Sequence, residues 1–226
     1  QLILQNKDDL GYFLKNKLVN IDNVAIIRGS GVDIKKFIPA EESTGVPIVM
    51  LASRMLWDKG VGEFVEAAKI LKQDGVEARF VLVGENDSEN PASMSNSQLN
   101  EWNELDIVEW WGEKNDMHKV LTQAHIVCLP SYREGLPKVL LEAASCGRAI
   151  IATDVPGCRE IVHNGENGIL VPLKDSSSLA SAIKELINNP EKRKRMGKSG
   201  RKLVENEFSE EIVVNQTMKV YQELLA

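Results

Sequence analysis

The sequence has few cysteines and histidines for its 226 residues, and it lacks the residue pairs that usually hold metals. Cys128, Cys146 and Cys158 form no Cys-x-x-Cys pair, so we expect buried reduced thiols rather than disulfides or a zinc site. The three histidines lack the spacing of metal ligands, and no Asp-x-Asp pair is present to hold a divalent cation on a diphosphate. The sequence therefore predicts no metal site and no bound cofactor.

Long apolar runs are also missing. No run approaches the roughly 20 residues that a membrane-spanning helix needs, and the first residues show no charged-then-apolar signal peptide, so we expect a cytoplasmic protein. The net charge of −6 argues against a nucleic-acid partner, and an anionic ligand would therefore need a local positive site. A hydrophobic fraction of 43% suits one or two soluble domains with a real core.

Short apolar runs alternate with segments of helical periodicity along most of the chain. From about residue 23 onward this alternation predicts an α/β fold with a doubly wound, mostly parallel, Rossmann-like sheet. The runs that read as strands are residues 23–28, 47–52, 78–85, 107–113, 125–129, 149–153 and 169–171. The main helices are expected at about residues 61–71, 137–147, 175–189, from Pro190 onward, and 210–225.

The stretch 131–147 organises the rest of the sequence. Pro137 suits the first position of a helix, and Gly147 suits a left-handed cap at its end. The start of a helix exposes unpaired N–H groups, and Gly135 lets a ligand approach the backbone closely. This strand-to-helix corner therefore predicts a site for a phosphate group.

Two carboxylates flank this predicted phosphate site. Glu134 precedes the helix and Glu142 lies within it, where they could accept hydrogen bonds from the sugar and the ribose of a nucleotide-sugar. An alternative stays open, because Lys138 and Glu142 are four residues apart and could form an ordinary solvated pair.

Two cations follow the predicted strand 47–52. Arg54 and Lys59 lie in a loop that should reach the same carboxyl edge of the sheet as loop 130–137. They would then converge on the phosphate site, Arg54 with a planar fork and Lys59 as a point charge. The plainer interpretation is a pair of surface cations.

These motifs carry a family resemblance. The stretch Glu134-Gly-Leu-Pro-Lys-Val-Leu-Leu-Glu142-Ala resembles the signature of retaining GT-B glycosyltransferases of family four, many of which build bacterial capsule and lipopolysaccharide. Ser53-Arg54 with Lys59-Gly60 is similar to the element of that family that contacts the diphosphate. Gly31-Val-Asp-x-x-x-Phe37-x-Pro39 resembles its interdomain crossover. The resemblance implies the C-terminal, donor-binding half of a GT-B fold.

The resemblance also implies roles for individual residues. Glu134 is the candidate catalytic residue, which would meet the donor sugar through positioning and electrostatics with no nucleophilic attack assigned to it, and Glu142 would bind the ribose. The candidate diphosphate contacts are Arg54, Lys59, Gly135, Leu136 and Pro137. Trp111 and Gly112 would lie beside the nucleobase and Gly84 at the pocket rim, although Trp111 could equally pack in the core and Gly84 could serve only as a turn.

The resemblance further implies how the chain is organised. Residues 1–22 would be a remnant of an N-terminal acceptor domain or its link, residues 23–208 the nucleotide-sugar-binding domain, and residues 209–226 a helix that crosses back to the acceptor domain, which is missing here. The expected function is metal-independent, retaining transfer of a sugar from a nucleoside diphosphate, UDP more than GDP, to a hydroxyl of a polysaccharide or lipid-linked oligosaccharide. A nucleotide-sugar 2-epimerase and a non-catalytic binding domain remain alternatives.

A basic run covers residues 192–202. Such a run is usually a solvated helix face, and contact with an acidic membrane surface remains the alternative. The second interpretation would place the full-length protein peripherally on the inner face of the membrane.

Overall fold

The computed structural model describes residues 1–225. The strands are β1 (Leu2–Leu4), β2 (Val24–Ile26), β3 (Ile48–Ala52), β4 (Arg79–Val83), β5 (Glu109–Trp110), β6 (Ile126–Leu129), β7 (Ala149–Thr153) and β8 (Gly168–Val171). The helices are α1 (Lys7–Lys15), α2 (Val61–Gln73), α3 (Asn96–Glu104), α4 (Met117–Leu121), α5 (Lys138–Ser145), α6 (Pro156–Arg159), α7 (Ser176–Asn188), α8 (Pro190–Glu207) and α9 (Glu210–Leu225).

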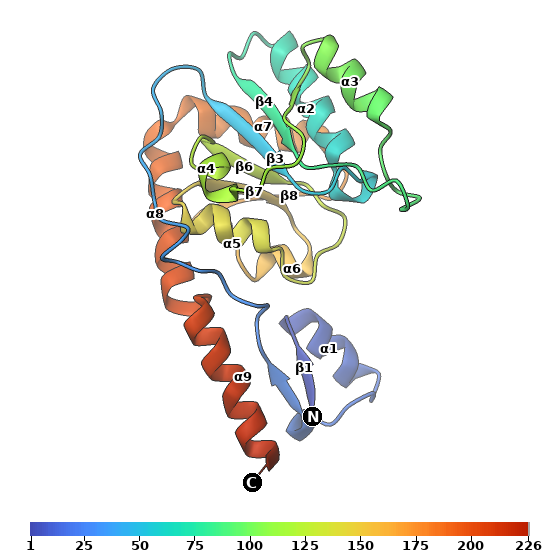
Figure 1. Cartoon of the computed structure of the whole chain (residues 1–226), viewed down its shortest axis with the longest axis vertical. Helices are drawn as coiled ribbons and strands as arrows, with labels where there is room; N and C mark the ends of the chain where they lie inside the picture. Colours follow the sequence, from blue (N-terminus) through green and yellow to red (C-terminus); the bar gives the residue numbers. More distant parts are fainter. Residues whose placement is uncertain (226) are drawn as a thin grey trace.

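The main sheet has six parallel strands in the order β5-β4-β3-β6-β7-β8. Strands β3, β6 and β7 are buried along their whole length, which explains why they read as continuous apolar runs instead of alternating ones. The chain runs from β3 outward to β5 and then back through β6 to β8 (Figure 1). The predicted doubly wound parallel α/β fold is confirmed.

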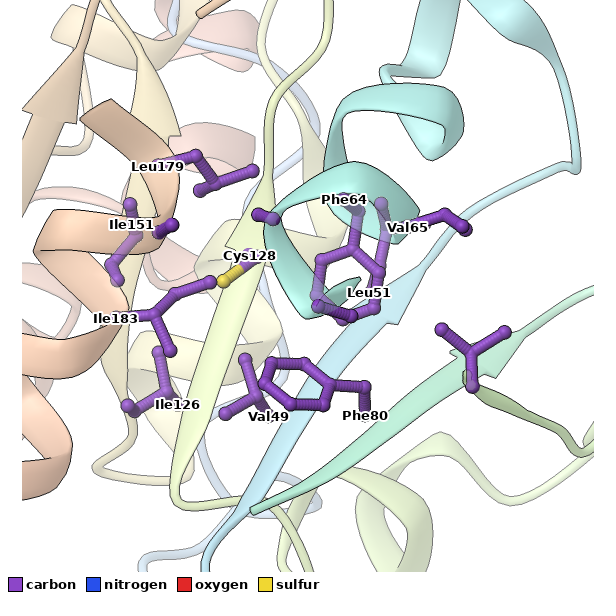
Figure 2. Packing of buried hydrophobic residues seen from close by; sticks show 14 of the residues in the cluster. Val49, Leu51, Phe64, Val65, Phe80, Ile126, Cys128, Ile151, Leu179 and Ile183 are labelled. Carbon is purple, nitrogen blue, oxygen red and sulfur yellow. The ribbon is translucent and has the colours of Figure 1, made fainter. Parts of the chain in front are cut away.

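Helices α2 and α7 cover one face of the sheet. Phe64 of α2 meets Phe80 of β4 edge to face with ring centroids 6.0 Å apart, and Ile183 of α7 lies near Cys128 and Ile151 (Figure 2). The apolar stripe predicted along residues 61–71 is the buried face of α2. This layer of the core fixes the start of α2, and therefore the end of the loop that follows β3.

Helices α4, α5 and α8 pack on the opposite face. The buried residues of this layer include Leu140 and Leu141 of α5, Val204 of α8, and Phe208, which directly follows α8. The predicted state of the three cysteines is confirmed, since all are buried free thiols. Burial raises the pKa of Cys146 and of Cys158 to about 12, so these thiols stay protonated at neutral pH.

The N-terminal residues form a separate small unit. The strand expected at residues 23–28 does form as β2, but it pairs with β1 in a two-stranded parallel sheet and does not join the main sheet. Ile27 then packs against Val213 and Val220 of α9, so this unit and α9 share one small core at the far end from the main sheet (Figure 1). The division of the chain at residue 22 stays a prediction.

The basic run on α8 is not simply a solvated face. Arg193 is 4% exposed and forms two hydrogen bonds to Glu42, of 2.9 and 2.7 Å. Arg201 donates to the carbonyl oxygens of Phe37 and Ser145 at 2.7 and 2.9 Å. The expectation of a solvated face was therefore wrong for these two arginines. Helix α8 packs on the loop before β3, and the two arginines donate hydrogen bonds to acceptors of that loop.

Candidate functional site

A cleft of about 470 Å³ opens at the carboxyl edge of the main sheet. Its walls come from the loops after β3 and β4, from the segment between β5 and α4, and from one face of α5. The residues that line it are Ala52, Ser53, Arg54, Val83, Gly84, Glu85, Asn86, Asp87, Glu113, Lys114, Met117, Val139 and Glu142. In open parallel sheets this edge is where ligands bind. Arg54, Gly84 and Glu142, all singled out in the sequence, share this cleft.

Arg54 is paired with a carboxylate inside the cleft. Its Nη1 lies 2.9 Å from Oδ2 of Asp87, and the Arg54 side chain is 62% exposed. An exposed ion pair of this kind contributes little net free energy, so exchanging Asp87 for a phosphate costs little. Arg54 is therefore positioned to bind an anion that enters the cleft.

Lys59 and Glu134 are brought into direct contact. Their Nζ and Oε1 atoms are 2.7 Å apart, and their side chains are only 20% and 12% exposed. The two residues belong to the loops that follow the neighbouring strands β3 and β6. The predicted meeting of the two loops is thus present as an ion pair, although neither side chain lines the cleft itself.

Glu142 lies on α5 and faces the cleft. Burial raises the pKa of this carboxyl group above its ordinary value of 4.5, although the charges of Lys138 and Lys36 lower it. Within residues 1–225, no hydrogen-bond donor contributes to this shift. Glu142 is therefore not the simple solvated partner of Lys138, and its acceptor oxygens are open to hydroxyl groups of a ligand.

Helix α5 begins one residue later than predicted. Pro137 is the residue before the helix, with φ −74° and ψ 111°, because its extended ψ keeps it outside the first turn. Its carbonyl oxygen accepts from Leu140 N at 3.1 Å. The N–H groups of Lys138 and Val139, at the start of the helix, therefore have no partner within the helix and can bind a ligand. Gly147 has φ +72° and ends the helix as predicted.

Two glycines allow the loops around the site to touch. Gly84 has φ +132°, and a Cβ there would collide with the carbonyl oxygen of Ser53 in the neighbouring loop. A Cβ on Gly157 would lie 2.5 Å from the carbonyl oxygens of Glu134 and Gly135. Larger residues at either position would push these loops apart.

Trp111 and Gly112 lie outside the cleft. The Trp111 Nε1 donates to Glu109 at 3.0 Å, and its ring packs in the core layer of α5. Trp110 instead donates to the carbonyl oxygen of Gly84 at 2.8 Å and so supports the rim. The cleft is lined here by residues slightly further along the chain, Glu113, Lys114 and Met117, which the sequence pattern did not single out.

The N-terminal unit also reaches the site. Asn6 is 1% exposed, and its Nδ2 donates to the carbonyl oxygen of Gly135 at 3.4 Å. Gln5 lies against Gly135 as well, with its Oε1 3.0 Å from where a Cβ of that glycine would be. Leu136 packs on Gly29 from the other side. Sequence patterns carry no signal for these contacts, because Asn6 and Gly135 are 129 positions apart.

No helix in residues 1–225 is both long and apolar enough to span a membrane. The same described residues contain no group of three or more His, Cys, Asp or Glu side chains that could hold a metal ion.

Comparisons with known proteins agree with this architecture. The family model described as "Glycosyl transferases group 1" matches residues 33–203. The N,N'-diacetylbacillosaminyl-diphospho-undecaprenol alpha-1,3-N-acetylgalactosaminyltransferase of Campylobacter jejuni is 31% identical over the whole chain, which covers 61% of that protein.

Solved structures show the same fold. Sucrose-phosphate synthase from Thermosynechococcus elongatus superposes with a TM-score of 0.84 at 26% identity, over 99% of this chain and 58% of that one. Anabaena Alr3699/HepE in complex with UDP superposes with a TM-score of 0.80 at 19% identity, over 98% of this chain and 62% of that one. The chain thus spans about three fifths of the length of these proteins. Because the family model matches most of the sequence, the chain belongs to the glycosyl transferases group 1 family.

Proposed function

We propose that this chain is the donor-binding part of a glycosyltransferase. The enzyme would move a sugar from a nucleoside diphosphate, UDP in preference to GDP, to a hydroxyl group of an acceptor, with retention of configuration and without a metal ion. The single observation that carries the proposal is the arrangement at the sheet edge. A cleft holding Arg54 and the half-buried Glu142 opens at the sheet edge where the loops after β3 and β6 bring Lys59 and Glu134 into contact.

Each group then has a role that its chemistry allows. Glu142 would accept hydrogen bonds from the ribose hydroxyls, while Arg54, Lys59 and the N–H groups around Gly135 and the start of α5 would hold the diphosphate. As the sugar–phosphate bond breaks, negative charge develops on the leaving diphosphate, and these fixed cations and dipoles would stabilise it. Two cations of the loop that follows β3, Arg54 and Lys59, would supply the positive charge that a metal ion would otherwise supply.

Glu134 would lie at the sugar end of the site. Its carboxylate already binds Lys59, and the carbonyl oxygens of Glu134 and Gly135 are held against Gly157. A diphosphate that engages Lys59 would free part of this carboxylate to accept from hydroxyl groups of the donor sugar. We assign Glu134 to orientation and electrostatic stabilisation, and we assign it no nucleophilic attack.

The choice of UDP and of the acceptor rests on the relatives. The HepE structure that shares this fold holds UDP, and the Campylobacter relative is named for transfer to a diphospho-undecaprenol sugar. We therefore propose an acceptor in lipid-linked oligosaccharide or polysaccharide synthesis and a place of action at the cytoplasmic face of the membrane. The acceptor would be bound by an N-terminal domain. The part of these relatives that this chain does not cover is long enough for such a domain.

Titration calorimetry of the 226-residue chain with UDP and with GDP tests the proposal. We expect UDP to bind with a stoichiometry of one and GDP to bind more weakly. We also expect little or no sugar transfer by this chain alone. A chain that is folded by circular dichroism and binds neither nucleotide would contradict the proposed function.

A further inference from the structure

A tyrosine and a glutamate make a second contact between side chains at the site, from loop 130–137 to helix α2. The Tyr132 hydroxyl donates to Oε1 of Glu63 at 2.6 Å. Tyr132 lies in loop 130–137, two residues before Glu134. Glu63 lies in the first turn of α2, four residues after Lys59. The hydrogen bond therefore joins the loop that carries Glu134 to helix α2, which begins two residues after Lys59.

The surroundings of this hydrogen bond keep it formed. Burial, followed by the hydrogen bond to Glu63, raises the pKa of Tyr132 to about 12, so the hydroxyl retains its proton at neutral pH. The Nζ of Lys174 lies 4.6 Å from the centre of the Tyr132 ring and covers it. The other oxygen of Glu63 is buried without a partner, so the tyrosine hydroxyl is the one donor to this carboxylate within residues 1–225.

The backbone beside the tyrosine is tied to the same loop. Tyr132 N donates to the carbonyl oxygen of Asp58 at 2.8 Å, and the Ser131 hydroxyl donates to that oxygen at 3.2 Å. Asp58 is the residue before Lys59. The positions of Lys59 and Glu134 are thus set by contacts of both the hydroxyl group and the backbone of Tyr132.

Once a nucleotide-sugar binds, the Lys59–Glu134 ion pair alone cannot hold the loops after β3 and β6 at their present separation. A phosphate that binds Lys59 competes with Glu134 for the same ammonium group, so the ion pair weakens when the site fills. The Tyr132–Glu63 hydrogen bond uses neither of those groups. It is therefore a contact between two side chains that can persist in the filled site, beside the hydrogen bonds of Ser131 and Tyr132 to the Asp58 carbonyl oxygen.

We propose that Tyr132 and Glu63 are positioning residues of the diphosphate site, which hold the two loops at a fixed separation when a diphosphate takes Lys59 from Glu134. The inference rests on the proposed function. A positioning role and a purely structural role predict different effects on nucleotide affinity. A general loss of stability would weaken the binding of all nucleotides alike, whereas a change in loop spacing would weaken the binding of the phosphate that reaches Lys59.

The test compares UDP with UMP, whose single phosphate stays beside the nucleoside. We expect Tyr132→Phe to raise the Kd for UDP about three- to tenfold, the effect of one lost hydrogen bond, and to leave the Kd for UMP nearly unchanged. Glu63→Ala should do the same. Glu63→Gln keeps an acceptor oxygen for the tyrosine and should restore most of the preference for UDP. Tyr221→Phe, which removes a hydroxyl from the exposed face of α9, is the matched control.

Circular dichroism and thermal unfolding without nucleotide establish that each variant is folded. If Tyr132→Phe does not fold, the comparison of Glu63→Gln with Glu63→Ala asks the same question from the other partner. Equal losses for UDP and UMP, or no loss for either, would overturn the positioning role. A wild-type chain that binds no nucleotide would instead overturn the proposed function, so the two failures are distinguishable.

Discussion

Replacing Glu142 by glutamine should change nucleotide affinity and chain stability in opposite directions. The carboxylate is half-buried in the cleft, and its pKa is raised chiefly by burial. Glutamine has nearly the same shape, and it keeps one acceptor oxygen but loses the charge. A lost charge-assisted hydrogen bond to the ribose costs about 1–3 kcal/mol, so we expect the Kd for UDP to rise about five- to 150-fold at pH 7.5.

The stability effect has the opposite sign. An acid whose pKa is higher in the folded state than in the unfolded state binds a proton more readily when folded, so wild-type stability falls as pH rises from 4.5 through the folded pKa of Glu142. Above that window the folded chain carries a buried charge that the glutamine variant lacks. We therefore expect Glu142→Gln to be more stable than wild type at neutral pH, with the difference shrinking toward pH 4.5.

Calorimetry with UDP and urea unfolding at several pH values measure the two effects. UDP affinity of the wild type should also fall as pH drops through the folded pKa of Glu142, and the variant should lose this dependence. Glu77→Gln, at an exposed position, is the matched control and should change neither quantity. A Glu142→Gln chain that binds UDP as tightly as wild type would refute the ribose contact, whatever its stability.

Three further predictions concern the other charged groups. Arg54→Ala should weaken UDP binding by about 1–3 kcal/mol in calorimetry while urea unfolding shows little change, because its bond to Asp87 is exposed; an unchanged Kd would remove Arg54 from the site. Arg193→Ala should lower the free energy of unfolding by about 3–5 kcal/mol, because it leaves the Glu42 carboxylate, 10% exposed, without its partner; a loss under 1 kcal/mol would contradict this reasoning. UDP titrations in excess EDTA and in excess Mg²⁺ should give the same Kd, and a large rise in EDTA would contradict metal-independent binding.

The parts of the fold that the sequence predicted are those set by local patterns. Residues 48–52, 126–129 and 149–153 are buried on both faces, so the requirement for apolar side chains appears at every position. The start of α7 was also readable, because Asp175 accepts from Ser178 N at 2.9 Å, as a helix cap should. Helix α3 was missed, since only Leu99 and Trp102 are buried in an otherwise polar segment.

The features that the sequence did not predict depend on partners distant along the chain. Arg193 reads as part of a basic run, yet its role is set by Glu42, 151 positions earlier. The pairing of β2 with β1 could not be told from pairing in the main sheet, because both strands are short. In the candidate site, patterns located Arg54, Lys59 and the two glutamates, while the Tyr132–Glu63 bond spans 69 positions and leaves no local signature.

The contact between Asn6 and Gly135 matters for anyone who shortens this protein to the domain proposed to bind the nucleotide. Starting the chain at residue 23 would follow the apparent boundary in the sequence, yet it would remove Asn6, the Lys7 amide that binds Glu160, and the Asp8 carboxylate that binds Arg159. The turn beside Glu134 would then lose the contacts that Gln5 and Asn6 make with Gly135. A useful minimal fragment should therefore keep the first strand and helix, even though they stand apart from the large sheet.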